Sequence, residues 1–140
     1  LMMIDVDHFK LFNDTHGHLE GDRCLQLIGE VLNVNVTTES EFAARYGGEE
    51  FALLLPDTSQ RQALATAERM RAEVAGMRIP HSGAPLGHIT VSIGVACMVP
   101  GDENVPQHLI EAADAGLYQA KRRGRNNVAV ESPDLVPETT

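Results

Sequence analysis

The chain has 140 residues, of which 43% are hydrophobic, and a formal net charge of −9. That length suffices for one domain with a buried core. This excess of acidic residues argues against nucleic-acid binding, because such binding depends mainly on basic side chains that neutralise phosphates. No apolar run approaches the ~20 residues that cross a bilayer, and no signal peptide is visible. We therefore expect a cytoplasmic domain without a nucleic-acid partner, although a longer parent protein could still be anchored in a membrane.

The first stretch, residues 1–7, is an apolar run that ends in two alternating acids, Asp5 and Asp7. It predicts a buried strand whose end carries both carboxylates on one face. Acids at the end of a central strand are common metal ligands, but Asp7 is better explained as the N-cap of the next helix. Because a domain rarely begins inside a core strand, we expect the chain to be a fragment of a longer protein.

Residues 9–12 predict a short helical turn, and residues 13–22 predict a loop rich in hydrogen-bonding groups. Loops of this kind carry recognition more often than packing. Its two histidines have no second His or Cys pair at zinc spacing, so zinc is not expected. Asp22 opens the next predicted helix, residues 23–34, and a simple N-cap would account for it. An apolar stripe at helical spacing predicts that this helix buries one face.

Two apolar runs, residues 42–46 and 51–55, flank two glycines and two glutamates. This pattern predicts the tip of a β-hairpin, because primed turns need positive φ angles that glycine adopts without steric cost. The adjacent carboxylates Glu49 and Glu50 would repel each other by about 4 kcal/mol at 4 Å and an effective dielectric of 20. A tip without side chains beside paired acids suits a phosphate group and its divalent metal ion.

The rest of the chain alternates helices with short strands. Residues 56–58 are expected to cap a helix over residues 60–77. The apolar stripe of this helix, which contains methionines, indicates that this face packs into the core. Residues 89–97 alternate large with small side chains, so another element can approach the small face closely. A last helix spans residues 107–123, followed by a short strand at residues 127–130. The tail, residues 131–140, is expected to be disordered.

The predicted order of elements is β-α-β-β-α-β-α-β, and its first six have the βαββαβ order of a ferredoxin-like or palm sheet. We therefore expect an α+β fold with an antiparallel-rich central sheet flanked by helices, plus an extra C-terminal helix and strand. In such a sheet the first strand can lie beside the hairpin, and neighbouring strands are ~4.8 Å apart. Asp5 and Glu49 would then reach one metal ion.

Five short motifs follow one another along the chain. The first three are IDVDHFK from Ile4, the pairs ND, GH and GD between Asn13 and Asp22, and RYGGEEF from Arg45. The last two are SIGVA from Ser92 and AxDxxLYxAKxxGRN from Ala112. Together they resemble the GGDEF domain of bacterial diguanylate cyclases. The match covers residues 1–130, which would form one nucleotidyl cyclase domain. Any one of these motifs is weak, but five in this order and spacing make the resemblance specific.

The resemblance implies an enzyme, a nucleotidyltransferase that condenses two GTP molecules into cyclic di-GMP and two pyrophosphates. Each domain would hold one GTP. Two domains of a homodimer would face each other, so that each 3′-hydroxyl attacks the α-phosphorus of the other GTP. The resemblance also implies an upstream sensory domain in the parent protein, as in bacterial second-messenger signalling.

The resemblance assigns the catalytic and metal-binding residues. It implies that Asp5, the backbone carbonyl of Val6 and Glu49 bind Mg²⁺ or Mn²⁺. These ions prefer hard oxygen ligands of this kind. Glu49 also matches the residue expected to act as base. Glu50 lies beside it in the sequence, and Lys10 resembles a residue that stabilises phosphate charge.

The resemblance also assigns the residues that hold the nucleotide. Asn13 and Asp22 resemble the pair that reads guanine, whose N1–H and N2–H₂ donors a single carboxylate can accept together, and adenine lacks this donor pair. A site built on such bonds rejects the wrong base because its polar groups would be left unpaired. His18 resembles a further substrate contact.

Four more residues would contact the phosphates. Gly47 and Gly48 leave room for them at the hairpin tip, whereas Lys121 and Arg125 resemble contacts to the γ- and β-phosphates. Without the other motifs, the positive charges of Lys121 and Arg125 would be explained by their favourable interaction with the C-terminus of a helix.

Two positions depart from a pattern that many members share. An Arg-x-x-Asp product-inhibition site precedes the signature in those members, but Thr38 and Glu41 occupy these positions here. We therefore expect no product feedback through that site.

Two other functions remain open. One is a catalytically inactive GTP-binding module that regulates a neighbouring domain, although inactive members usually lose a site residue and none is lost here. The other is a palm-type nucleotidyl cyclase or polymerase. Asp22 and the glycine tip argue against it.

Overall fold

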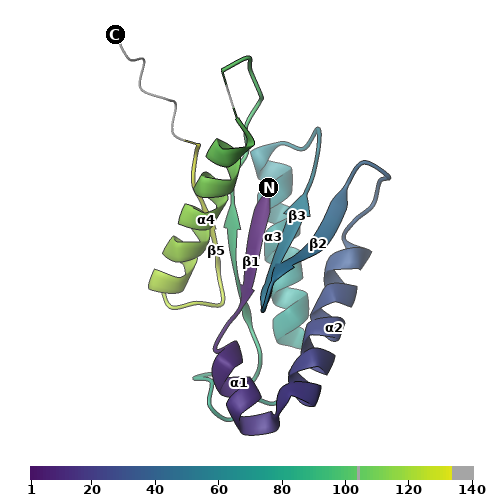
Figure 1. Cartoon of the computed structure of the whole chain (residues 1–140), viewed down its shortest axis with the longest axis vertical. Helices are drawn as coiled ribbons and strands as arrows, with labels where there is room; N and C mark the ends of the chain where they lie inside the picture. The colour runs from purple at the N-terminus through teal and green to yellow at the C-terminus, as the bar shows by residue number, and fades with distance from the viewer. Residues whose placement is uncertain (104, 134–140) are drawn as a thin grey trace.

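The computed structural model describes residues 1–103 and 105–133, and within them five strands form one sheet in the order β2-β3-β1-β4-β5 (Figure 1). Neighbouring strands run antiparallel except β4 and β5, which are parallel. The strands are β1 (Met2–Val6), β2 (Phe42–Gly47), β3 (Glu50–Leu54), β4 (Val91–Val95) and β5 (Val128–Val130).

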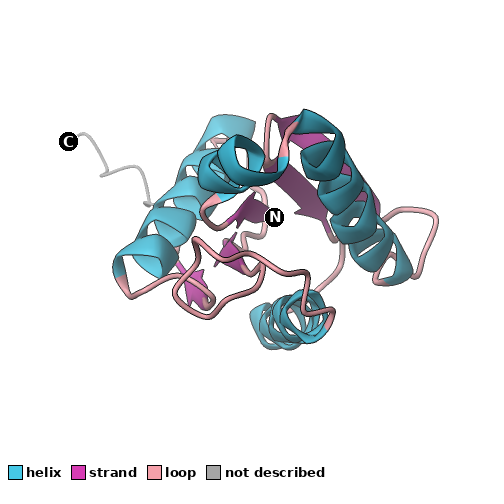
Figure 2. Cartoon of the chain, turned by 90° about the horizontal axis from the view of Figure 1, so that it is seen from below, coloured by secondary structure: helices cyan, strands magenta, loops and turns pink. Residues whose placement is uncertain are grey.

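Helices cover both faces of this sheet (Figure 2). Alternate residues of β1 point to opposite faces. Met2 and Ile4 belong to the larger core cluster, together with residues of α2 and α3. Met3 packs with residues of α4 in a second cluster. The helices are α1 (Phe9–His16), α2 (His18–Val34), α3 (Gln60–Gly76) and α4 (Pro106–Arg122).

The predicted α+β fold is confirmed, including the βαββαβ core and the extra C-terminal helix and strand. Cys24 is buried and Cys97 is partly buried against the core, and both are free thiols. Burial raises the pKa of the Cys24 thiol to about 11, as expected for an unreactive core residue. No helix in the described ranges is long and apolar enough to cross a membrane. The predicted tail lies outside the described residues from position 134 onward.

The loop predicted for residues 13–22 is wrong. The segment is helical except for Gly17, where α1 ends and α2 begins one residue later. Gly17 has φ +87°, which lets the chain change direction between the two helices. The polar residues that favoured a loop instead lie mostly on the exposed sides of these helices. Asp22 therefore lies inside α2 and is not its N-cap.

The cap of α3 also differs from the prediction. Ser59, rather than residues 56–58, is the N-cap residue, and it forms a capping box with Gln62. The Ser59 hydroxyl accepts from the Gln62 backbone N–H at 3.2 Å, and the Gln62 side chain accepts from the Ser59 N–H at 3.0 Å. This reciprocal pair satisfies two N–H groups that the first turn of a helix leaves without partners.

The small face of β4 allows α4 to lie close to the sheet, as the alternation predicts. A Cβ atom added at Gly94 would overlap the backbone of α4 at Ala113 and Leu117. We expect Gly94→Ala to lower the free energy of unfolding by about 3 kcal/mol, because backbone atoms cannot move aside as flexible side chains can. Urea denaturation followed by circular dichroism measures this loss.

Gly29→Ala is the matched control for Gly94→Ala. A Cβ atom at Gly29, inside α2, would meet only Phe51 at 3.9 Å, which is an ordinary contact. Alanine is also the better helix former, so this variant should gain up to ~1 kcal/mol. Equal losses in the two variants would contradict the close approach of α4 to β4.

Candidate active site

The end of β1, the hairpin tip, the start of α1 and the end of α4 meet at one end of the sheet, the lower end in Figure 1. Strand β1 pairs with β3 so that Asp5 lies opposite Glu50. One step further, the Val6 N–H donates to the Glu49 carbonyl at 3.3 Å. The predicted neighbourhood of the first strand and the hairpin is therefore confirmed. It brings Asp5 beside both glutamates.

Asp5 is the centre of this cluster. It is only 6% exposed, and its Oδ2 lies 2.8 Å from the Lys121 ammonium of α4. Burial raises the pKa of the Asp5 carboxyl, the bond to Lys121 and its charge lower it, and the charges of Glu49 and Asp7 raise it further. With Glu50 and Asp114, whose charge also raises the pKa of Glu50, five carboxylates and one ammonium group interact in this cluster.

The cluster suits a divalent cation. Carboxylates are hard oxygen ligands of the kind that Mg²⁺ and Mn²⁺ prefer. The Lys121 ammonium already holds a cationic position against Asp5, which shows that the site favours positive charge. Within the described residues, no three His, Cys, Asp or Glu side chains form a ready-made metal site.

The raised pKa of Glu50 predicts a stability effect. Burial is its main cause, and the charge of Asp5 follows. A carboxyl group whose pKa is raised by folding stabilises the folded state while it is protonated, and this contribution is lost as the pH rises through the folded-state pKa. In metal-free buffer at pH 7, Glu50→Gln should therefore melt about 1–3 °C above the wild-type chain.

The pH dependence distinguishes this effect from a general gain in stability. Below the ordinary glutamate value of 4.5, the wild-type side chain is itself protonated, so the advantage of Glu50→Gln should vanish. Differential scanning calorimetry at several pH values measures the difference in melting temperature between Glu50→Gln and the wild type. Glu39→Gln, in the exposed connection before β2, is the control and should not change the melting temperature. A gain that persists at acidic pH would contradict the assignment.

The residues predicted to read the base lie at the junction of α1 and α2. Asn13 is on α1, whereas His18 and Asp22 are four residues apart on α2 and therefore share a face of that helix. A Cβ atom added at Gly21 would overlap Asn13 Oδ1, so the two helices approach closely here. Asn13 Oδ1 is buried and accepts no hydrogen bond from the described residues. Asn13 Oδ1 therefore has unused hydrogen-bonding capacity, although the protein itself covers it in this structure.

The remaining predicted contacts are exposed at the same end of the sheet. Lys10 lies on α1, one turn before Asn13. A Cβ atom added at Gly47 or Gly48 would meet no described atom within 4 Å, so the hairpin tip has free space above it. The Nε–H of Arg45 donates to the Gly48 carbonyl at 2.8 Å and braces this tip.

The structure corrects the prediction for Asp7. The N-cap position of α1 belongs to His8, and no side chain caps the helix there. Asp7 is instead buried, and it accepts hydrogen bonds from the side chains of Thr90 and Ser92 and from the backbone of Asn126. The strand alternation carried a signal for this burial, since Asp7 follows Asp5 on the same face. Its partners, more than 80 residues away, had no signal in the sequence.

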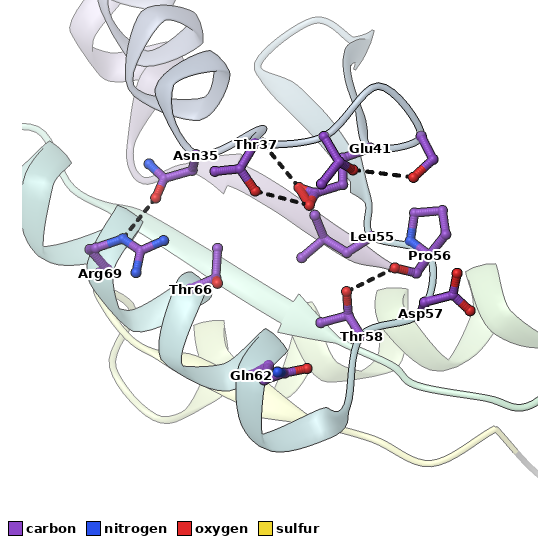
Figure 3. A pocket seen from close by; sticks show the side chains of 12 residues that line it. Asn35, Thr37, Glu41, Leu55, Pro56, Asp57, Thr58, Gln62, Thr66 and Arg69 are labelled. Atoms are coloured by element: carbon purple, nitrogen blue, oxygen red, sulfur yellow. Dashed lines mark hydrogen bonds between the residues drawn. The ribbon is translucent and has the colours of Figure 1, made fainter.

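The positions where a product-inhibition site would lie are at the other end of β3. Thr38 and Glu41 line a cavity of about 410 Å³ between the α2–β2 connection and the start of α3 (Figure 3). Glu41 accepts hydrogen bonds from the backbone N–H and the hydroxyl of Thr37. Arg69 Nε donates to Asn35 at 2.9 Å. The absence of product feedback through this cavity stays a prediction.

The sheet order and the acidic cluster at the end of its central strand define an α+β domain of the ferredoxin-like class. Residues 1–127 match the family model described as diguanylate cyclase, GGDEF domain. The chain therefore belongs to the GGDEF family.

Curated relatives agree with this assignment. The chain is 39% identical over 135 residues to diguanylate cyclase A of Treponema denticola, with 96% of the chain and 36% of the relative covered. It is 43% identical over 129 residues to response regulator PleD of Caulobacter vibrioides, covering 91% of the chain and 28% of that protein. The chain thus spans about a third of the length of these relatives.

Solved structures agree in fold. The GGDEF domain of DgcB from Caulobacter crescentus, in complex with c-di-GMP, is 40% identical and superposes with a TM-score of 0.81. That match covers 94% of this chain and 75% of DgcB's. The active GGEEF domain of a diguanylate cyclase from Vibrio cholerae is 34% identical, with a TM-score of 0.77 and coverages of 93% and 80%.

Proposed function

We propose that the chain is a diguanylate cyclase domain that condenses two GTP molecules into cyclic di-GMP and two pyrophosphates. One observation carries this proposal: Asp5 lies opposite Glu50 at the hairpin tip and pairs with Lys121 at 2.8 Å. The carboxylates that would bind a metal ion and the Lys121 ammonium that would bind a phosphate therefore lie next to each other. Sequence identities of 39–43% to proteins named as diguanylate cyclases or PleD support it.

Asp5, the Val6 carbonyl and Glu49 would hold Mg²⁺ or Mn²⁺. When bound, such an ion polarises the α-phosphate and lowers the pKa of the attacking hydroxyl group. Lys121, now paired with Asp5, can exchange that carboxylate for a phosphate oxygen when the substrate binds. Lys10 and Arg125 would add positive charge around the triphosphate, and the open space at the glycine tip would admit it.

The helix junction would select guanine. The exposed carboxylate of Asp22 can accept hydrogen bonds from the N1–H and N2–H₂ donors of guanine, and the Asn13 side chain, whose Oδ1 has no partner among the described residues, would rotate outward to contact the base. His18 lies on the same face of α2 as Asp22 and would contact the substrate beside it. Adenine lacks the N1–H and N2–H₂ donors, so with ATP the Asp22 carboxylate would lose the pair of hydrogen bonds that it accepts from guanine.

Each chain would carry half of the reaction. Glu49 would take the proton of the attacking 3′-hydroxyl, with Glu50 contributing charge beside it. The α-phosphorus under attack would belong to a GTP on a second copy, because the described part of the chain has one hairpin tip and one proposed base-reading junction. A homodimer with the two hairpin tips facing each other is therefore part of the proposal, and product formation per molecule should increase with protein concentration.

The experiment is incubation of this chain, and of a longer protein that contains it, with GTP and Mg²⁺ over a range of protein concentrations. Mass spectrometry identifies the products. Cyclic di-GMP whose yield per molecule rises with concentration supports the proposal. GTP binding without any product, in both proteins, would contradict it and indicate a regulatory GTP-binding module.

A further inference from the structure

A buried carboxylate outside the proposed metal-ligand set joins three segments of the chain. Asp7 is 3% exposed, and its Oδ1 accepts a hydrogen bond of 2.6 Å from the Ser92 hydroxyl. Its Oδ2 accepts from the Thr90 hydroxyl at 2.7 Å and from the backbone N–H of Asn126 at 3.0 Å. Burying a carboxylate is costly, and hydrogen bonds to its charged form offset that cost. Asp7 is therefore a fixed anchor between β1, β4 and the turn after α4.

The turn that Asp7 contacts has an unusual backbone. Gly124, Arg125 and Asn126 have φ angles of +110°, +65° and +47°. Glycine adopts such angles freely, but residues with a Cβ atom adopt them in succession only where their surroundings hold them. The hydrogen bond from the Asn126 N–H to Asp7 holds the end of this run.

Helix α3 holds the same turn from another side. Asn126 Oδ1 accepts a hydrogen bond of 2.9 Å from Arg71 Nη1, and Arg71 is itself paired with Glu68 of the same helix. Within the turn, Asn127 Nδ2 donates to the Arg125 carbonyl at 3.1 Å. The turn therefore has a defined shape before any ligand binds, and Asp7 is its link to β1.

Asp5 and Asp7 lie two residues apart on one face of the chain at the end of β1. Asp5 belongs to the proposed metal site, whereas Asp7 contacts the turn that carries Arg125. We propose that Asp7 is a positioning residue that fixes the turn of residues 124–126, and so Arg125, relative to Asp5. This inference rests on the proposed function, because that function assigns Arg125 to the triphosphate.

The test is a double-mutant cycle on the 140-residue chain. The probe is 3′-deoxy-GTP with Mg²⁺, which keeps the triphosphate but lacks the attacking hydroxyl group and so cannot react. Calorimetry measures its affinity for the wild type, Asp7→Asn, Arg125→Ala and the double variant. We expect each single substitution to weaken binding roughly tenfold. The double variant should bind about as weakly as Arg125→Ala alone, because Asp7 acts through Arg125.

The outcomes separate this inference from the proposed function. A wild type that does not bind the probe, or an Arg125→Ala variant that binds normally, would overturn the phosphate assignment and the inference with it. Normal binding by Asp7→Asn, or additive losses in the double variant, would overturn the inference alone. Asp57→Asn, at the other end of β3, is the matched control and should bind normally.

A second readout needs no nucleotide. Amide hydrogen exchange at Asn126 should be faster in Asp7→Asn than in the wild type, and an unchanged rate would also overturn the inference. If Asp7→Asn does not fold, Thr90→Val replaces it in the cycle, since it removes only one donor to the same oxygen. Its loss of affinity should be smaller, about threefold, and absent in the Arg125→Ala background.

Discussion

Replacing Glu49 with glutamine is expected to abolish cyclic di-GMP formation while the fold persists. The substitution keeps the shape of the side chain but removes its charge, so the metal site loses a ligand and the attacking hydroxyl loses its base. Removing one preorganised charge of this kind lowers kcat by roughly 10²–10³-fold, and the loss of two roles should place Glu49→Gln at or beyond that range.

The melting temperature distinguishes this loss from unfolding. The charge of Glu49 raises the pKa of both Asp5 and Glu50, so the ionised glutamate opposes ionisation of its neighbours. Glu49→Gln should therefore melt at the wild-type temperature or slightly above it. Glu103→Gln, in the exposed connection before α4, is the control and should keep full activity. Near-normal activity of Glu49→Gln would contradict the metal and base assignments.

Replacing Asp22 with alanine is expected to remove the preference for GTP over ATP. Asp22 is exposed on α2 beside the junction with α1, and its carboxylate would accept from two donors that adenine lacks. Sites that read a base through buried or paired polar groups discriminate by 10⁴ or more, so the GTP-to-ATP ratio of kcat/KM should fall by at least ~10²-fold. Steady-state kinetics with both nucleotides measures this ratio.

Glu20→Ala is the matched control for Asp22→Ala. Glu20 is also exposed on α2 but lies two residues away, on a different side of the helix. The Glu20→Ala variant should leave the GTP-to-ATP ratio of kcat/KM unchanged. If Asp22→Ala keeps its selectivity for GTP, the base-reading role of Asp22 is wrong, although the metal site could still be correct.

The parts of the fold set by periodicity could be predicted from the sequence. The apolar run of β1 and the alternation of β4 each identify a strand, and the glycines at 47 and 48 identify the hairpin between β2 and β3. The βαββαβ order then restricts the topology, so β1 could be placed beside the hairpin. That topology does not set the register of the strands, and the pairing of Asp5 with Glu50 is known only from the structure.

Other features depend on tertiary contacts and could not be predicted. Residues 13–22 have the composition of a loop, yet α1 and α2 form there because they pack against each other across Gly21. Asp7 has the sequence context of an N-cap, but donors from β4 and from the turn after α4 hold it in the interior. The pairing of Lys121 with Asp5 likewise joins residues 116 positions apart, and no local pattern encodes it.

The most direct measurement of the central claim is the stoichiometry of the reaction with GTP and Mg²⁺. Purified protein is incubated with GTP, and nucleotide products and pyrophosphate are quantified together, with Glu49→Gln as the inactive reference. The proposed function predicts one cyclic di-GMP and two pyrophosphates for every two GTP consumed, and none of either with Glu49→Gln. GTP that is bound but not consumed, or pyrophosphate released without cyclic di-GMP, would contradict it.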